Sequence, residues 1–78
     1  MRVKKPTLII TFATTTQAMA VEKFCGDNQL PGRIIPVPRE ITAGCGLSWK
    51  AAPEDKEQLA TALEGSGLGY EEMYIIEI

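Results

Sequence analysis

The periodicity of the apolar residues switches repeatedly between two and about 3.6 along this 78-residue chain, and this limits the folds open to it. Period-two segments, rich in β-branched residues and typical of strands, occupy residues 7–12, 32–37, 47–50 and 73–78. Helical periodicity begins near Thr14 and again at Pro53. The predicted order of elements is therefore β-α-β-β-α-β.

Local signals indicate where the two helices begin and end. Thr14, followed three residues later by Gln17, fits a capping box at the start of the first helix. Gly26 and Asn28 are expected to end that helix. Pro53 suits the first turn of the second helix, which a run of glycines then ends.

The simplest way to bury these apolar faces is to pack both helices on one face of a four-stranded antiparallel sheet. Pro36 and Pro38 each lack a backbone donor, so the strand at 32–37 is expected at a sheet edge, and the strand at 7–12 is expected to be central. Right-handed crossovers then give the ferredoxin-like split βαβ arrangement. We predict one α+β domain spanning residues 1–78.

Composition excludes several functions. The net charge is −2 and the basic residues are scattered along the sequence, so nucleic acid is not an expected partner. No apolar run is long enough to cross a bilayer and no signal-peptide pattern precedes the first strand, so a cytoplasmic protein without a membrane partner is expected. Histidine is absent and there are two cysteines, too few for an iron–sulfur cluster, so we predict no metal and no bound cofactor.

The residue whose side chain is best suited to a chemical role is Cys45, which lies between Gly44 and Gly46. Flanking glycines permit positive φ and leave a sulfur uncrowded, and successive amides could stabilise a thiolate. Arg39 is the nearest cation in the sequence. The alternative is that both glycines are turn residues and Cys45 packs inward, as Leu47 and Trp49 are expected to do.

The remaining candidates have plain structural explanations beside their functional ones. Cys25 shares a helical face with Val21, which favours core packing over chemistry. Arg39 and Glu40, held by a proline-stiffened chain, either orient a partner and complete the surroundings of Cys45 or form a solvated loop.

The run Ile35-Pro36-Val37-Pro38-Arg39-Glu40-Ile41, followed by Cys45-Gly46, resembles the selenium/sulfur carrier protein-like family of small bacterial domains. The segment from Phe12 through Glu22 also resembles that family's first strand and helix. The resemblance therefore covers nearly the whole chain, with the motif intact.

This resemblance implies a carrier more than an enzyme with its own turnover. Its cysteine, here Cys45, would receive sulfane sulfur or selenium from a donor such as a cysteine desulfurase and hand it to an acceptor enzyme. Arg39, Glu40, Gly44 and Gly46 are the supporting residues around Cys45, and the resemblance places Arg39 and Glu40 in the motif without assigning them a role. The expected partners are transient donor and acceptor proteins, and a homodimer is left open.

Two other hypotheses remain open at this point. One is a non-catalytic interaction or regulatory module in which Cys45 is structural, since fold alone does not decide function. The other is a thiol–disulfide protein with a reversible Cys25–Cys45 bridge.

Overall fold

The structure is a computed structural model that describes residues 4–41 and 46–78. Its elements follow the predicted order β-α-β-β-α-β. They are β1 (Pro6–Thr11), α1 (Thr15–Asp27), β2 (Arg33–Pro36), β3 (Leu47–Ala51), the 3₁₀ turn η1 (Pro53–Asp55), α2 (Lys56–Ser66) and β4 (Glu72–Glu77). The strands form one sheet in the order β2-β3-β1-β4 with antiparallel neighbours, so the ferredoxin-like α+β fold is confirmed.

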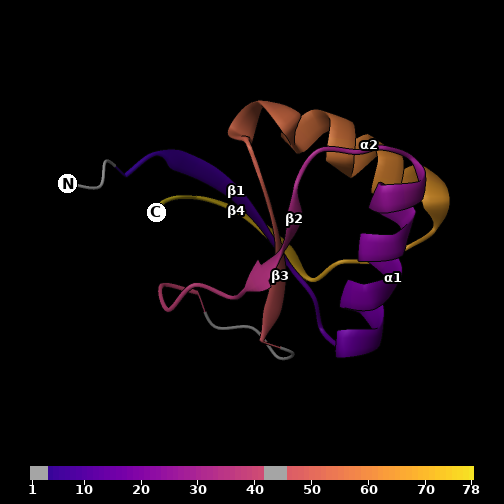
Figure 1. Ribbon diagram of the computed structural model, residues 1–78, viewed down its shortest axis with the longest axis horizontal. Coiled ribbons are helices and arrows are strands. Elements are labelled where there is room, and N and C mark those ends of the chain that lie inside the picture. The colour runs from indigo at the N-terminus through magenta and orange to yellow at the C-terminus, as the bar shows by residue number, and fades with distance from the viewer. Residues whose placement is uncertain (1–3, 42–45) are drawn as a thin grey trace.

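Both helices lie on the same side of the sheet (Figure 1). Between the helices and the sheet lies a core of buried side chains from β1, α1, β3 and α2. Its members are Leu8, Ile10, Phe12, Ala18, Val21, Cys25, Trp49, Ala51, Leu59 and Leu63. Alternate residues of β1 supply this layer, as the period-two pattern predicts.

The strand order confirms the two predictions about sheet position. β2 pairs with β3 alone, and Pro36 closes the strand at the sheet edge, where a missing N–H leaves no ladder bond broken. β1 pairs with β3 on one side and β4 on the other, so it is central. In β4, Met73 packs against the core, whereas Tyr74 and Ile76 lie on the opposite face of the sheet.

The start of α1 is capped as predicted, with one difference. The Gln17 backbone N–H donates to Thr14 Oγ1 at 3.1 Å. The Gln17 side chain accepts from the backbone N–H of Ala13 at 2.8 Å, one residue before the position that a capping box uses. Two amide donors outside the helical hydrogen-bond pattern are satisfied by this pair of contacts.

The end of α1 was only half predicted. Gly26 lies inside the last turn and does not end the helix, so that prediction was wrong. Asn28 is the C-cap, and its Nδ2 donates to the Phe24 carbonyl at 2.8 Å. The left-handed backbone that follows belongs to Gln29, with φ of 54°. A side-chain cap therefore takes the place of the glycine cap that the sequence suggested.

We expect Thr14→Ala to lower the free energy of unfolding by about 1 kcal/mol, because the Gln17 amide loses its acceptor. The matched control is Thr16→Ala, an exposed position in the first turn of the same helix whose side chain makes no capping contact, which should change stability by less than about 0.5 kcal/mol. Urea unfolding followed by circular dichroism measures both. Equal losses in the two variants would show that the cap contributes nothing.

The start of α2 also differs slightly from expectation. Pro53 occupies the short 3₁₀ turn η1, and the α-helix itself begins at Lys56. Gly67 ends α2 with φ of 79°, a left-handed conformation that glycine adopts without steric cost. Neither described helix is long and apolar enough to cross a bilayer.

Candidate functional site

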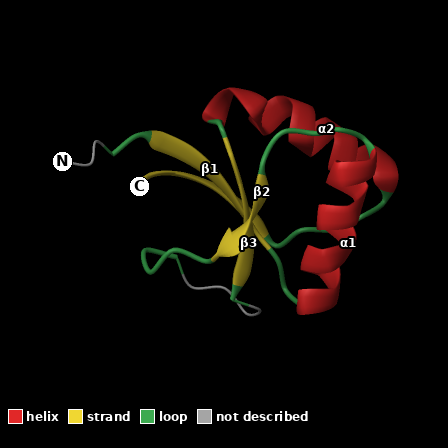
Figure 2. Cartoon of the chain, in the orientation of Figure 1, coloured by secondary structure: helices red, strands yellow, loops and turns green. Residues whose placement is uncertain are grey.

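The motif from Ile35 to Ile41 runs from the end of β2 into the connection between β2 and β3. The described part of this connection leaves the sheet on the side away from the helices (Figure 2). Val37 N–H donates to the Gly46 carbonyl at 2.9 Å, which ties the two ends of the connection together just beyond the β2–β3 ladder. Ile41 N–H donates to the Pro38 carbonyl at 2.9 Å and closes a tight turn. The connection is therefore held at its base and at Ile41.

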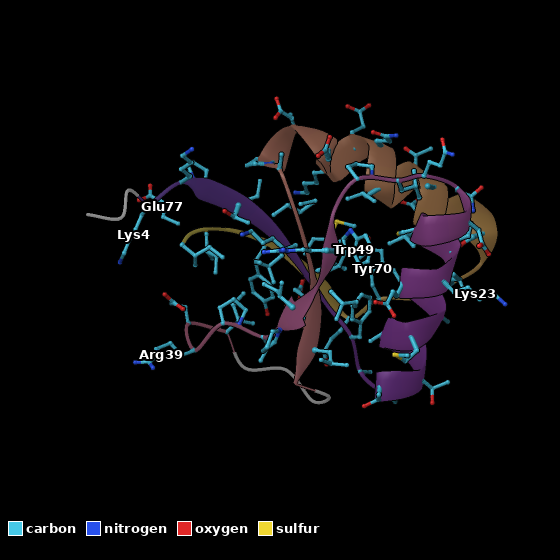
Figure 3. All side chains as sticks on the ribbon, in the orientation of Figure 1. Lys4, Lys23, Arg39, Trp49, Tyr70 and Glu77 are labelled. Atoms are coloured by element: carbon cyan, nitrogen blue, oxygen red, sulfur yellow. The ribbon has the colours of Figure 1, made fainter. Side chains whose placement is uncertain are left out.

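Arg39 and Glu40 occupy the two central positions of that turn, and both are exposed. Figure 3 shows Arg39 extending away from the sheet. Ile41, the next residue, is 7% exposed and anchors the turn against the protein. Within the described part of the chain, neither charged side chain forms an ion pair, so both can contact a partner.

Gly46 has φ of +76°, and open space surrounds the position that a Cβ would occupy. The glycine is therefore required by its backbone conformation and not by crowding. Gly44 and Cys45 lie outside the described residues, so the exposure of the Cys45 thiol stays a prediction. In β3, which follows Gly46, Leu47 packs against the core and Trp49 is 4% exposed, as the sequence predicted.

The face of the sheet away from the helices is well packed at the end where this connection leaves it. Thr11 and Ser48, which are register partners there, are both fully buried. Thr11 Oγ1 donates to the Glu72 carbonyl and Ser48 Oγ to the Ile35 carbonyl, each at 3.4 Å. These long hydrogen bonds satisfy both hydroxyls, so the motif is presented from an ordered base.

Cys25 is fully buried in the core and is a free thiol. Desolvation by burial raises its pKa from the ordinary value of 9.0, because the thiolate would lie among apolar side chains. The prediction of core packing is confirmed. A buried thiol with a raised pKa is a poor nucleophile and a poor disulfide partner.

The raised pKa of Cys25 predicts a loss of stability at alkaline pH. Above about pH 9 the unfolded chain releases the Cys25 proton while the folded protein keeps it, so the free energy of unfolding falls by up to about 1.4 kcal/mol per pH unit until the folded pKa is reached. Below the unfolded pKa this stabilising contribution is fully present. Urea unfolding between pH 8 and 10.5 measures the slope.

The control for this prediction is Cys25→Ala, which removes the titrating group and leaves the lysines and tyrosines in place. We expect the alkaline loss of stability to be smaller in this variant by the contribution of Cys25. Identical slopes in the two proteins would contradict a raised pKa at this position.

Metal ligands do not gather in the described part of the chain. No group of three or more cysteine, aspartate or glutamate side chains lies close enough there to hold a metal ion, and the whole sequence contains no histidine. Among the described residues of the motif and of the segment up to β3, the features that could serve a function are the exposed charges of Arg39 and Glu40 and the positive φ of Gly46.

Comparison with known proteins gives one match. No curated protein and no solved structure matches the chain. A family model does match, over residues 7–75, and it spans every strand and helix described above apart from the outer ends of β1 and β4. By this match, the chain belongs to the family described as "Putative Se/S carrier protein-like".

Proposed function

We propose that this protein carries sulfur or selenium as a persulfide or perselenide on Cys45, between a donor such as a cysteine desulfurase and an acceptor enzyme. The observation that carries the proposal is the family match over residues 7–75, which includes the whole motif from Ile35 to Gly46. A carrier must expose a nucleophilic atom without enclosing a substrate. A cysteine next to a tethered turn suits that requirement.

The two cysteines of the chain are not equivalent candidates. Cys25 is sealed in the core, and its pKa is raised, so the folded protein cannot offer it to a partner enzyme. Cys45 directly precedes Gly46, whose carbonyl fixes the end of the connection to Val37. By elimination, a transferable sulfur atom would be bound at Cys45.

The transfer is a thiol-exchange reaction without net oxidation. The Cys45 thiolate attacks the outer sulfur of a donor persulfide, a new S–S bond forms, and the donor's S–S bond breaks. The donor leaves as a thiolate, and the proton of the outer sulfur stays with it on Cys45. An acceptor thiolate then repeats the same step on the Cys45 persulfide. Selenium transfer follows the same scheme with S–Se bonds.

Arg39 and Glu40 are suited to partner contact. Both project from the turn closed by the Ile41–Pro38 hydrogen bond, and Arg39 is six and Glu40 five residues before Cys45 in the sequence. Charged rim residues mainly set the rate and orientation of encounter, and a carrier needs fast, short-lived encounters more than tight binding. We therefore assign these two residues to orientation of the donor or acceptor.

The direct test is to incubate the protein with a cysteine desulfurase and cysteine and then measure its intact mass under non-reducing conditions. We expect a mass gain of one sulfur atom that dithiothreitol removes. A selenocysteine lyase with selenocysteine tests the selenium form in the same way. No adduct with either donor would refute the carrier function and favour an interaction module in which Cys45 is structural.

A further inference from the structure

A shallow depression lies at the end of the sheet farthest from the β2–β3 connection, and basic side chains line it. Its cations are Lys5, just before β1, Arg33 at the start of β2, and Lys50 near the end of β3. They are three of the eight basic residues in a chain whose net charge is −2. The fold thus concentrates positive charge on an otherwise acidic protein.

The β-sheet register makes this concentration costly for the free protein. Arg33 and Lys50 are direct partners across the β2–β3 ladder and therefore project from the same face of the sheet. Like charges directly opposite each other in a sheet are destabilising. In the described part of the chain no carboxylate forms an ion pair with Lys5, Arg33 or Lys50. An anion bound between them would relieve this repulsion.

The rest of the lining is mostly apolar, and one acidic side chain, that of Glu54, lies among it. The other lining residues are Pro6, Thr7, Gly32, Ala51, Ala52, Pro53 and Ile78. The depression is wide, with a volume of about 1000 Å³, and it lies open at the surface. Small-molecule sites normally enclose most of their ligand, so this shape suits a segment of another protein better.

We propose that this depression binds an acidic segment of a partner protein, whose carboxylates pair with Lys5, Arg33 and Lys50 while its apolar atoms contact the proline and alanine surface. Arginine and lysine bind carboxylates through charge-assisted hydrogen bonds, and complementary charge gives fast and selective encounter. The proposal needs only the charge and shape of the described residues. It therefore stands independently of the sulfur chemistry at Cys45.

The test titrates a hexaglutamate peptide into ¹⁵N-labelled protein at low salt and follows the amide resonances. We expect the largest shifts at Gly32, Arg33, Lys50, Ala51 and Ala52, and we expect them to weaken strongly at about 0.5 M salt. The double variant R33E/K50E should weaken binding by at least about tenfold. Arg33→Gln, which removes one charge without reversing it, should weaken binding by a smaller factor and guards against misfolding of the double variant.

The matched control is Lys23→Glu, at an exposed position on α1 outside the depression. It makes the same change in charge as the single variant R33E, which should weaken binding more than Arg33→Gln does, whereas Lys23→Glu should leave the affinity within about twofold. A loss of binding as large in Lys23→Glu as in R33E would overturn the proposal, since net charge alone would explain it. Equal shifts with inorganic phosphate, or tighter binding of a short oligonucleotide at the same amides, would also overturn it. Shifts that depend on protein concentration without peptide would assign the depression to self-association instead.

Discussion

Cys45→Ser is expected to abolish sulfur loading completely, whereas Cys25→Ala should load as the wild type does. A serine hydroxyl is nearly the size of the thiol, but it is not ionised near neutral pH and cannot form a persulfide. Cys25 is fully buried, so its removal takes away no accessible nucleophile. Formation of the sulfur adduct should therefore require Cys45 and should not require Cys25.

The comparison is made by intact mass spectrometry after incubation of each variant with desulfurase and cysteine, followed by peptide mapping. Cys25→Ala controls for the loss of a thiol and also for a loss of stability. It removes the sulfur atom from the core and should lower the free energy of unfolding by about 1 kcal/mol or slightly more. If Cys45→Ser were loaded with sulfur to the same extent as the wild type, the sulfur would be bound at another residue and the assignment of Cys45 would be refuted. Loss of loading in Cys25→Ala, with folding intact, would favour a mechanism that uses both thiols.

Gly32→Ala is expected to lower the free energy of unfolding by roughly 3 kcal/mol, a large fraction of the stability of a domain this small. Gly32 has φ of +112°, a conformation that residues with a side chain rarely adopt. A Cβ at this position would also overlap the Trp49 indole and the Lys50 backbone carbonyl. The indole cannot move away without losing the 3.0 Å hydrogen bond from Trp49 Nε1 to the Pro31 carbonyl.

The matched control is Gly26→Ala, in the last turn of α1. No atom approaches a Cβ there, and the backbone is helical, so alanine should stabilise the protein by about 0.5–1 kcal/mol. The same substitution at two glycines is thus expected to change stability in opposite directions. The midpoints of urea unfolding, followed by the fluorescence of Trp49, measure the change in stability of each variant. A loss of less than about 1 kcal/mol at Gly32 would show that the strand and the indole can shift apart easily.

Much of the candidate site could be proposed from the sequence because the motif is local. The residues from Ile35 to Gly46 are contiguous, so their identity and order could be read directly. Burial of Cys25 followed from its place on an apolar helical face, and the structure confirms it. The hydrogen bond from Val37 to Gly46, which closes the connection, requires the strand register and could not be read in this way.

The basic depression could not be predicted from the sequence, because its cations are far apart along the chain. Lys5, Arg33 and Lys50 are scattered along the sequence, and each has different sequence neighbours. Only one signal was available: pairing of β2 with β3 as an antiparallel hairpin would have set Arg33 opposite Lys50. The length of the connection left that register undetermined, since a long loop does not fix strand pairing as a two-residue turn does.

The order of the strands and helices, the helix-facing residues of β1 and β3 and the edge position of β2 were determined by the sequence alone, because periodicity and proline act over a few neighbouring residues. Tertiary structure decided what depends on pairing between distant segments. It buried Thr11 and Ser48 on the second face of the sheet, packed Trp49 against Gly32, and gathered three cations at one end. Backbone hydrogen bonds between strands fix those neighbours, and no local pattern encodes the register in which two distant strands pair.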